Sequence, residues 1–380
     1  MFLEAISKKK PIFAPVKSKK LHIIAPYPRG EAPSQRFRFE QYLSFLEANG
    51  YDIRYHSFHT PKSWERLYRK GLFVQKFLDL NYNFLRRWIL LFRLIGAQNL
   101  FMHREMAHLG PPVFEWMLVK VLRKKYTYDF DDAIWIPNYS AANARFQKLK
   151  CYWKVPYLIR WAAKVSAGND FLAAYARSFN PNVEVIPTTI DLVNQHTGQV
   201  DHDRKPVVIG WTGTHSTMHY LDFVVPILRK LEKEFDFRFK VISNKKPDYD
   251  LKSLVYLDWK EETEMEDLAE IQIGIMPLVL DPWSEGKCGF KALQYMALGM
   301  AGIVSPVGVN TRIIQHGQNG LIAETTEEWE QAIRSLLENE TLRKELGTQA
   351  ARTIQEQWSV EVWKANYLRL VENGECKIEH

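Results

Sequence analysis

The stretch DPWSEGKCGFKALQYMALGMAGIVSPVG, residues 281–308, carries the most informative pattern in the chain. It predicts a glycine-containing loop, a helix from about Gly289 to Leu298, a buried strand and a second glycine loop. Lys287 and Lys291 are four positions apart, so both project near the start of this helix, and Gln294 lies on the same face. Free N–H groups at a helix start attract anions. The two lysines therefore either hold a diphosphate, with Gln294 reaching a ribose hydroxyl, or form an ordinary solvated face.

The alternation of strand and helix extends over the whole chain. Short apolar runs predict strands at 21–25, 51–56, 99–103, 125–129, 164–167, 183–186, 207–211, 239–243, 254–257, 271–276 and 301–305. Helical patterns separate them, which implies parallel, doubly wound sheets. The polar residues 194–206 are the predicted linker. We expect an α/β fold of two Rossmann-like domains, 1–200 and 201–358, facing each other across a cleft, with a helix at 359–380 that returns to the first domain.

Composition and charge narrow the class of protein. A chain of 380 residues with 46% hydrophobic and 25% charged residues is not intrinsically disordered. Three widely spaced cysteines exclude a disulfide framework and favour a reducing, cytoplasmic setting. Residues 1–20 lack a signal-peptide apolar run, and the apolar stretch 88–95 is short and interrupted by Arg93, so neither secretion nor a membrane span is predicted. The net charge of +7 divides into +15 for residues 1–200 and −8 for residues 201–380, which points to an anionic partner for the first half.

Residues 271–321 resemble the donor-binding region of GT-B fold glycosyltransferases, close to the retaining family 4 (glycosyl transferases group 1) and to its lysine-bearing branch. The motifs that carry the resemblance, in order, are Gly274-Ile-Met-Pro-Leu278, Gly286-Lys-Cys-Gly-Phe-Lys291, Tyr295-Met-Ala297, Gly299, Ser305-Pro-Val-Gly308 and Asn319-Gly-Leu321. The commoner form of the family has two glutamates where this chain has Gly286 and Gln294. The resemblance implies that Lys287 takes over charge neutralisation and that Gln294 contacts the ribose as an amide.

The resemblance implies a hexosyltransferase-type enzyme that moves a sugar from a nucleotide-sugar donor to a hydroxyl of a glycan or lipid-linked acceptor, with retained anomeric configuration. Preorganised cations and N–H dipoles stabilise a departing diphosphate, and Lys287, Lys291 and the Gly213 loop are the expected groups. In enzymes of this kind the diphosphate itself helps to accept the proton, so no protein nucleophile is required. Two alternatives stay open: a non-catalytic membrane or nucleic-acid binding protein of the same fold, and a nucleotide-sugar epimerase.

Loops after strands of the second domain supply the other expected donor contacts. Thr212, Gly213 and Thr214 follow the first strand of this domain, where the resembling family has a phosphate-binding loop, and we expect them to contact the diphosphate or the sugar. Ser243 and Trp259 follow the next two strands, which flank the nucleotide base in that family. Interdomain packing is an equal alternative for Trp259.

Acidic residues gather at strand ends in the first domain. The segment YDFDDAIW places Asp129, Asp131 and Asp132 at the C-terminal end of a strand, where open α/β sheets bind ligands. We expect Asp131 and Asp132 to orient an acceptor hydroxyl and Asp129 to be structural. The resemblance implies no obligatory metal ion. Glu105 either contacts the acceptor or pairs with its neighbour Arg104 to hold the loop.

Two basic segments of the first domain are candidates for anionic ligands. Ser34, also a predicted helix cap, and Arg36 lie in the first strand-to-helix loop, which either reaches the donor phosphates or an anionic acceptor, or is a solvated turn. Residues 62–93 hold eight basic residues, two acidic residues and eight aromatics. This mixture suits an anionic membrane, single-stranded nucleic acid, or an amphipathic helical pair with its aromatics in the core. The resemblance favours the membrane, so we expect a cytoplasmic protein, peripheral on the inner face of the membrane, with nucleic acid the less favoured partner.

Overall fold

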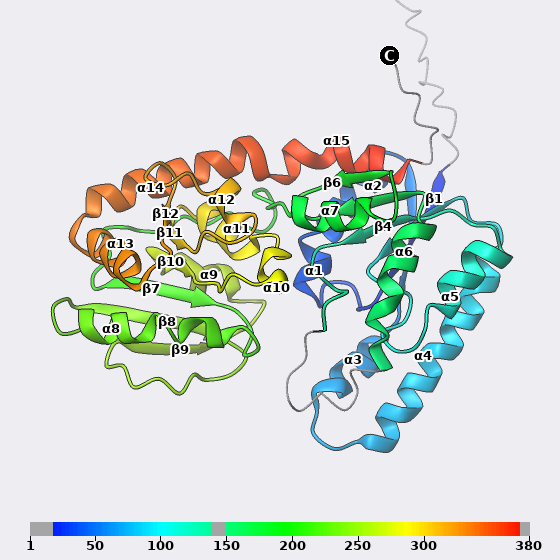
Figure 1. The fold of residues 1–380 in the computed structure, drawn as a ribbon, viewed down its shortest axis with the longest axis horizontal. Coiled ribbons are helices and arrows are strands. Elements are labelled where there is room, and N and C mark those ends of the chain that lie inside the picture. Colours follow the sequence, from blue (N-terminus) through cyan, green and yellow to red (C-terminus); the bar gives the residue numbers. More distant parts are fainter. Residues whose placement is uncertain (1–17, 138–148, 373–380) are drawn as a thin grey trace, which may run out of the picture.

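The computed structural model describes residues 18–137 and 149–372, which form two six-stranded parallel sheets (Figure 1). The first sheet contains β1 (Lys19–Ala25), β2 (Tyr51–Ser57), β3 (Asn99–His103), β4 (Thr127–Phe130), β5 (Lys164–Ala167) and β6 (Val183–Val185), in the order β2-β1-β3-β4-β5-β6. The second contains β7 (Val207–Thr212), β8 (Phe237–Ser243), β9 (Leu254–Asp258), β10 (Ile273–Met276), β11 (Ala301–Val304) and β12 (Leu321–Ile322), in the order β12-β11-β10-β7-β8-β9. The predicted fold of two doubly wound α/β domains is confirmed.

Helices cover the faces of both sheets. Those of the first domain are α1 (Pro33–Arg36), α2 (Leu43–Ala48), α3 (Pro61–Tyr68), α4 (Phe73–Arg93), α5 (Val113–Trp116), α6 (Val155–Trp161) and α7 (Asp170–Arg177). The others are α8 (Val225–Leu231), α9 (Glu264–Ala269), α10 (Pro282–Glu285), α11 (Phe290–Ala297), α12 (Asn310–Ile313), α13 (Thr326–Glu338), α14 (Glu340–Thr353) and α15 (Val360–Val371). The prediction of one helix capped by Ser34 is wrong. The segment is divided into α1, a 3-10 turn at Glu40–Tyr42 and α2, and α1 begins with Pro33 after Ala32.

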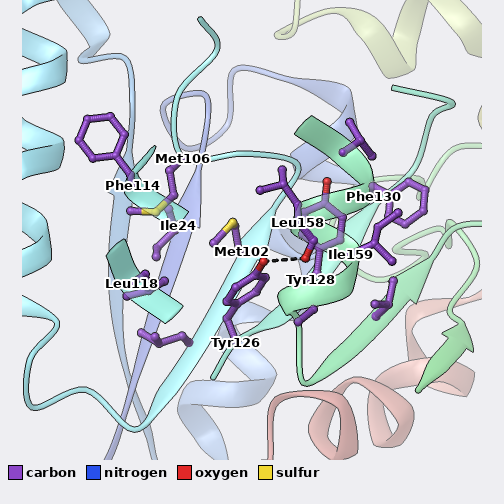
Figure 2. Packing of buried hydrophobic residues seen from close by; sticks show 14 of the residues in the cluster. Ile24, Met102, Met106, Phe114, Leu118, Tyr126, Tyr128, Phe130, Leu158 and Ile159 are labelled. Atoms are coloured by element: carbon purple, nitrogen blue, oxygen red, sulfur yellow. Dashed lines mark hydrogen bonds between the residues drawn. The ribbon is translucent and has the colours of Figure 1, made fainter. Parts of the chain in front are cut away.

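The strands are buried because helices lie on both faces of each sheet, as parallel sheets require. All four residues of β10 and all four of β11 are buried, and the two strands pair in register from Ile273 opposite Ala301 to Met276 opposite Val304. Figure 2 shows the corresponding core of the first domain. In that core the Tyr126 hydroxyl donates a 2.6 Å hydrogen bond to the Leu158 carbonyl, so the polar group of this buried side chain has a partner.

Helix α15 runs from the second domain back over the first, along the upper edge of the molecule in Figure 1. Its entry is fixed by paired backbone hydrogen bonds, from Ile190 N–H to the Trp358 carbonyl at 2.9 Å and from Val360 N–H to the Ile190 carbonyl at 3.0 Å. The Tyr367 ring then stacks on Tyr42 with centroids 3.8 Å apart. The terminal helix thus packs in a hydrophobic core of the first domain. Residues 373–380 of the predicted helix lie outside the described residues.

Candidate active site

Lys287 lies in the loop between α10 and α11, and Lys291 lies in the first turn of α11, where the second domain faces the first. The Lys287 ammonium is 5.6 Å from the centroid of the Trp283 ring, and that of Lys291 is 5.4 Å from the centroid of Trp211. Burial, together with the neighbouring Lys287 cation, lowers the pKa of Lys291 to about 7, although Asp132 opposes the shift. Burial and the repulsion between the two lysines disfavour the Lys291 cation, and a bound diphosphate would relieve that cost.

The loop after β7 meets Lys291, as the sequence predicts. A Cβ atom on Gly213 would lie 2.6 Å from the Trp211 ring and 3.0 Å from Cε of Lys291, so only glycine fits between them. Thr212 N–H donates to the Tyr295 hydroxyl at 3.1 Å, which fixes the loop on α11. The Thr214 hydroxyl lies 2.7 Å from the Ser216 hydroxyl and is exposed. Backbone and hydroxyl groups of this loop therefore adjoin a lysine side chain.

The loop between α10 and α11 is pressed against the first domain. The Cys288 thiol donates to the Asp131 carbonyl at 3.1 Å. The Asn169 amide donates to the carbonyls of Glu285 and Lys287 at 3.1 and 3.0 Å. The side chains of Cys288 and Asn169 were not among the predicted site residues, because only the tertiary structure places them at the domain interface. These contacts set Lys287 opposite the carboxylates of the first domain.

Gly286 stands where the commoner family form has a glutamate, and the domain interface explains the change. A Cβ atom there would lie 2.7 Å from Cβ and 2.9 Å from the backbone nitrogen of Ala133, a residue that is itself fully buried. We expect Gly286→Ala to force the domains apart and lower turnover at least tenfold, with about 1–3 kcal/mol lost in stability. Turnover and thermal unfolding should be compared with Gly96→Ala, whose added methyl group meets no atom within 4 Å. Equal behaviour of the two variants would contradict the close-approach explanation.

Asp131 and Asp132 of the first domain share one guanidinium. Arg104 contacts Asp131 at 2.7 Å and Asp132 at 2.6 Å, from a backbone with φ of 59°. Burial and the Asp131 charge raise the pKa of Asp132, while Arg104 and Lys287 act in the opposite direction. The second carboxylate therefore experiences the Lys287 cation across the domain interface. Arg104 itself was not a predicted site residue; the sequence does not show which acid it pairs with.

Glu105 lies in a separate ion-pair cluster. Its carboxylate contacts the Lys154 ammonium and His108 Nδ1, each at 2.6 Å. Burial alone would raise the pKa of Glu105, but Lys154 and His108 outweigh it and hold the pKa at about 2. The alternative of a pair with Arg104 is wrong, since Arg104 binds the two aspartates. The lowered pKa favours the charged form of Glu105, which lies just after β3.

The remaining predicted contacts gather around the ends of β8 and β9. Trp259 N–H donates to the Ser243 carbonyl at 3.1 Å, so these two candidates are neighbours; Ser243 is fully buried and Trp259 is 36% exposed. Gln294 is also fully buried, and its amide donates to the Glu264 carboxylate at 3.3 Å. Glu264, at the start of α9, is a carboxylate that the sequence analysis did not identify.

Arg36 and Ser34 lie on the first-domain side of the same region. The Arg36 guanidinium is 3.4 Å from Glu261 and 3.6 Å from Glu264, so it bridges the two domains. Ser34 is partly exposed within α1. The first strand-to-helix loop is therefore no purely solvated turn, because Arg36 contacts the second domain.

A family model and several solved structures match this chain. Residues 206–339 match the family model described as Glycosyl transferases group 1. The fold is shared with the sucrose-phosphate synthase of Thermosynechococcus elongatus (11% identity, 93% of this chain and 98% of that chain, TM-score 0.69). It is also shared with HepE of Anabaena in complex with UDP and glucose (12% identity, 94% of this chain and 100% of that chain, TM-score 0.62). A glycosyltransferase of Rickettsia africae shares it as well (14% identity, 94% of this chain and 100% of that chain, TM-score 0.61). A sequence search of curated proteins found no match.

The class of protein follows from these findings together: the chain has the GT-B fold, and its second domain is a group 1 glycosyltransferase domain. The prediction of a GT-B glycosyltransferase is confirmed.

Proposed function

We propose that this enzyme transfers a sugar, with retention, from a nucleoside diphosphate sugar to a hydroxyl of a glycan or lipid-linked acceptor, as the family 4 resemblance implies. The observation that carries the proposal is the pair Lys287 and Lys291, held over aromatic rings at the start of α11 and facing Asp132 of the first domain. As the bond from the anomeric carbon to the diphosphate oxygen breaks, the two ammonium groups stabilise the charge that develops on the diphosphate. The acceptor oxygen bonds to the anomeric carbon, and its proton passes to the departing diphosphate.

The first-domain carboxylates are proposed to act on the acceptor. Asp132 is the more exposed of the Arg104-bound pair, with 27% of its side chain accessible against 12% for Asp131, so it is the one that can accept a hydrogen bond from the acceptor hydroxyl. Arg104 keeps both carboxylates in place, and its charge opposes the rise in the pKa of Asp132 that burial and Asp131 cause. In this proposal the lysines of the second domain bind the donor, and the carboxylates of the first domain bind the acceptor.

Binding of a nucleoside diphosphate tests the donor site directly. We expect one of UDP, GDP, ADP and the monophosphate CMP to raise the melting temperature of the protein, because a ligand that binds only the native state stabilises it by RT ln(1 + [L]/Kd). The matching nucleotide sugar should be consumed. UDP is the first choice because the HepE structures contain UDP, UDP and glucose, or UDP-glucose. Stabilisation without turnover on any sugar acceptor would favour the non-catalytic alternative.

Catalysis is proposed to need no divalent ion. Arg104 forms ion pairs with both Asp131 and Asp132, and Arg38 pairs with Asp129 at 2.5 Å. Among the described residues no group of three or more His, Cys, Asp or Glu side chains is arranged to hold a metal. We expect EDTA to leave turnover unchanged within twofold. Loss of activity in EDTA that Mg²⁺ or Mn²⁺ restores would refute this proposal.

A membrane-facing surface on α4 is proposed as the route to a lipid-linked acceptor. This helix lies on the outer side of the first domain, away from the second domain (Figure 1). Most of its exposed side chains are apolar: Phe73 (83% exposed), Val74 (68%), Phe77 (65%), Leu78 (61%), Tyr82 (56%), Leu85 (55%), Trp88 (40%), Ile89 (44%) and Phe92 (73%). Exposed apolar surface of this extent marks an interaction site. In the described part of the chain no helix is long and apolar enough to cross a bilayer, so contact would be interfacial.

The basic residues of segment 62–93 contribute unequally to this surface. Arg87 is 2% exposed and donates to the carbonyls of Met106, His56 and Ala25, so it stabilises the core instead of facing lipid. Lys62, Lys70 and Arg93 are exposed and remain candidates for lipid phosphates.

An apolar groove of about 300 Å³ lies between α5 and α6, next to α4. It is lined by Pro111, Pro112, Val113, Trp116, Trp153, Tyr157 and Trp161. The Trp88 ring of α4 packs edge-on against Phe114 of α5, with centroids 5.1 Å apart, so the groove and the α4 face adjoin. The lining of this groove is apolar and largely aromatic, which suits a hydrocarbon chain.

Vesicle binding by the full chain tests the surface. We expect sedimentation with anionic vesicles that falls with salt, and at least tenfold weaker binding when Phe73, Phe77 and Phe92 are all replaced by serine. A Val193→Ser/Val362→Ser variant is the control, because those exposed residues lie elsewhere. Equal binding to neutral and anionic vesicles, or competition by single-stranded DNA, would remove the anionic-membrane proposal.

A further inference from the structure

A second hollow in the described part of the chain lies between the two domains. It has a volume of about 250 Å³. The first domain lines it with the loop between β5 and α7 and with the end of β6, the second domain lines it with α12, and the residues around the start of α15 complete it. Figure 1 shows α7 and α12 below α15. The lining residues are not among the candidate donor and acceptor contacts, so this interdomain pocket is a separate site.

Two tryptophans supply the aromatic part of the pocket lining. Trp358 is 6% exposed, and its carbonyl accepts a 2.9 Å hydrogen bond from Ile190 N–H. The Trp363 indole N–H donates to the Gln357 carbonyl at 2.8 Å, so the direction of this half-buried ring is fixed. Val309 adds apolar surface from the second domain. A surface that is already rigid binds a ligand with little loss of side-chain freedom.

The polar side chains of the pocket are balanced in charge. Asp170 and Arg312 form an ion pair at 2.6 Å, with 68% and 61% of their side chains accessible. The exposed Gln357 amide offers both donors and an acceptor. An ion would meet one attractive and one repulsive charge here, whereas a neutral ligand with several hydroxyl groups can donate to Asp170 and accept from Arg312. The pocket therefore favours a polyol over an anion or a cation.

We propose that the interdomain pocket binds one sugar ring, at a site distinct from the candidate active site. A pyranose has hydroxyl groups around its edge, which suit the ion pair and the amide. It also has a face of C–H groups, which packs against an aromatic ring. The pocket is smaller than the roughly 300–1,000 Å³ of typical ligand sites, which limits the ligand to about one ring.

A sugar in this position also bears on how the domains are held. Both domains supply walls of the pocket, so the sugar binds this arrangement of the domains in preference to a more open one and stabilises it. Asn169, which lines the pocket, donates to the Lys287 carbonyl at 3.0 Å. The site therefore adjoins the loop that carries Lys287.

Saturation-transfer NMR of the full chain tests the pocket, with glucose, galactose, mannose and N-acetylglucosamine supplied one at a time. We expect at least one of them to bind, with the strongest saturation on the C–H protons of one ring face. Trp363→Leu removes the fixed ring and should weaken binding at least about fivefold. Trp116→Leu is the matched control, because it removes a tryptophan, 48% exposed, from the groove between α5 and α6 and should leave binding unchanged.

The outcomes separate this site from the candidate active site. Binding of none of the four sugars, unchanged binding in Trp363→Leu, or an equal loss in Trp116→Leu would overturn the proposal. Binding that is lost in Asp132→Asn but kept in Trp363→Leu would place the sugar at the acceptor carboxylates and overturn it as well. If Trp363→Leu does not fold, Arg312→Gln takes its place, because that side chain is exposed, and a loss of binding is again expected. Failure of every nucleoside diphosphate to bind would overturn the proposed function alone, since the sugar site does not rest on it.

Discussion

Lys287→Ala is expected to lower turnover by about 10²-fold or more and to weaken nucleoside diphosphate binding. Its ammonium lies over Trp283 and acts electrostatically on Asp132, so it is positioned before the substrate arrives. A preorganised charge of this kind needs no rearrangement when the diphosphate leaves, and removing one such group costs about 10²- to 10³-fold in rate. Steady-state kinetics with saturating acceptor measures the loss.

The control for this variant is a lysine of similar chemistry outside the site. Lys233, exposed just after α8, serves, and Lys233→Ala should leave turnover unchanged. Lys287→Arg should recover part of the rate because it restores the charge with a different shape. Unchanged kinetics in a folded Lys287→Ala protein would remove α11 from the donor site.

The fold could be predicted because each buried strand has a recognisable local sequence pattern. Parallel strands covered on both faces appear as short apolar runs that end at glycine, proline or polar residues, as β7 and β10 do. The capping box of Thr325 and Glu328 likewise predicts the start of α13, and both hydrogen bonds are present. The strand β12 was missed because two residues carry no periodicity.

The candidate site could be predicted only in part, for a geometric reason. The resemblance assigns both the Gly213 loop and Lys291 to the donor diphosphate, and the structure places the two side by side. Gly286 contacts Ala133, and Gln294 contacts Glu264. The members of each pair are far apart in the sequence and meet only in the folded chain, so no local pattern predicts these contacts. Charge counting failed in the same way at Arg87, which belongs to the core.

Asp129 is the residue whose loss should most reduce stability. It lies on β4, fully buried, and its carboxylate contacts Arg38 at 2.5 Å, His103 at 2.8 Å and the Ser166 hydroxyl at 2.7 Å. These partners come from β3, β5 and the segment after α1, so one carboxylate joins three parts of the first domain. Burial by itself would raise the pKa of Asp129, but the Arg38 and His103 interactions outweigh it and hold the pKa below its ordinary value.

Asp129→Asn is therefore expected to cost about 3–5 kcal/mol of unfolding free energy, because it leaves the Arg38 guanidinium buried without its counter-charge. Since the folded pKa is depressed, the carboxylate stabilises the native state fully above the unfolded value of about 3.9, and this stability is lost as the pH falls toward the folded pKa. The variant should consequently lose less stability than the native protein between about pH 4 and the acid limit.

Asp170→Asn is the matched control, because its 2.6 Å pair with Arg312 is exposed on both sides and such pairs contribute at most about 1 kcal/mol. Urea unfolding at pH 7 measures the cost of each substitution, and unfolding at about pH 2.5 measures how much of the Asp129 contribution is lost in acid. A cost at Asp129 no larger than that at Asp170 would show that the buried network does not stabilise the first domain.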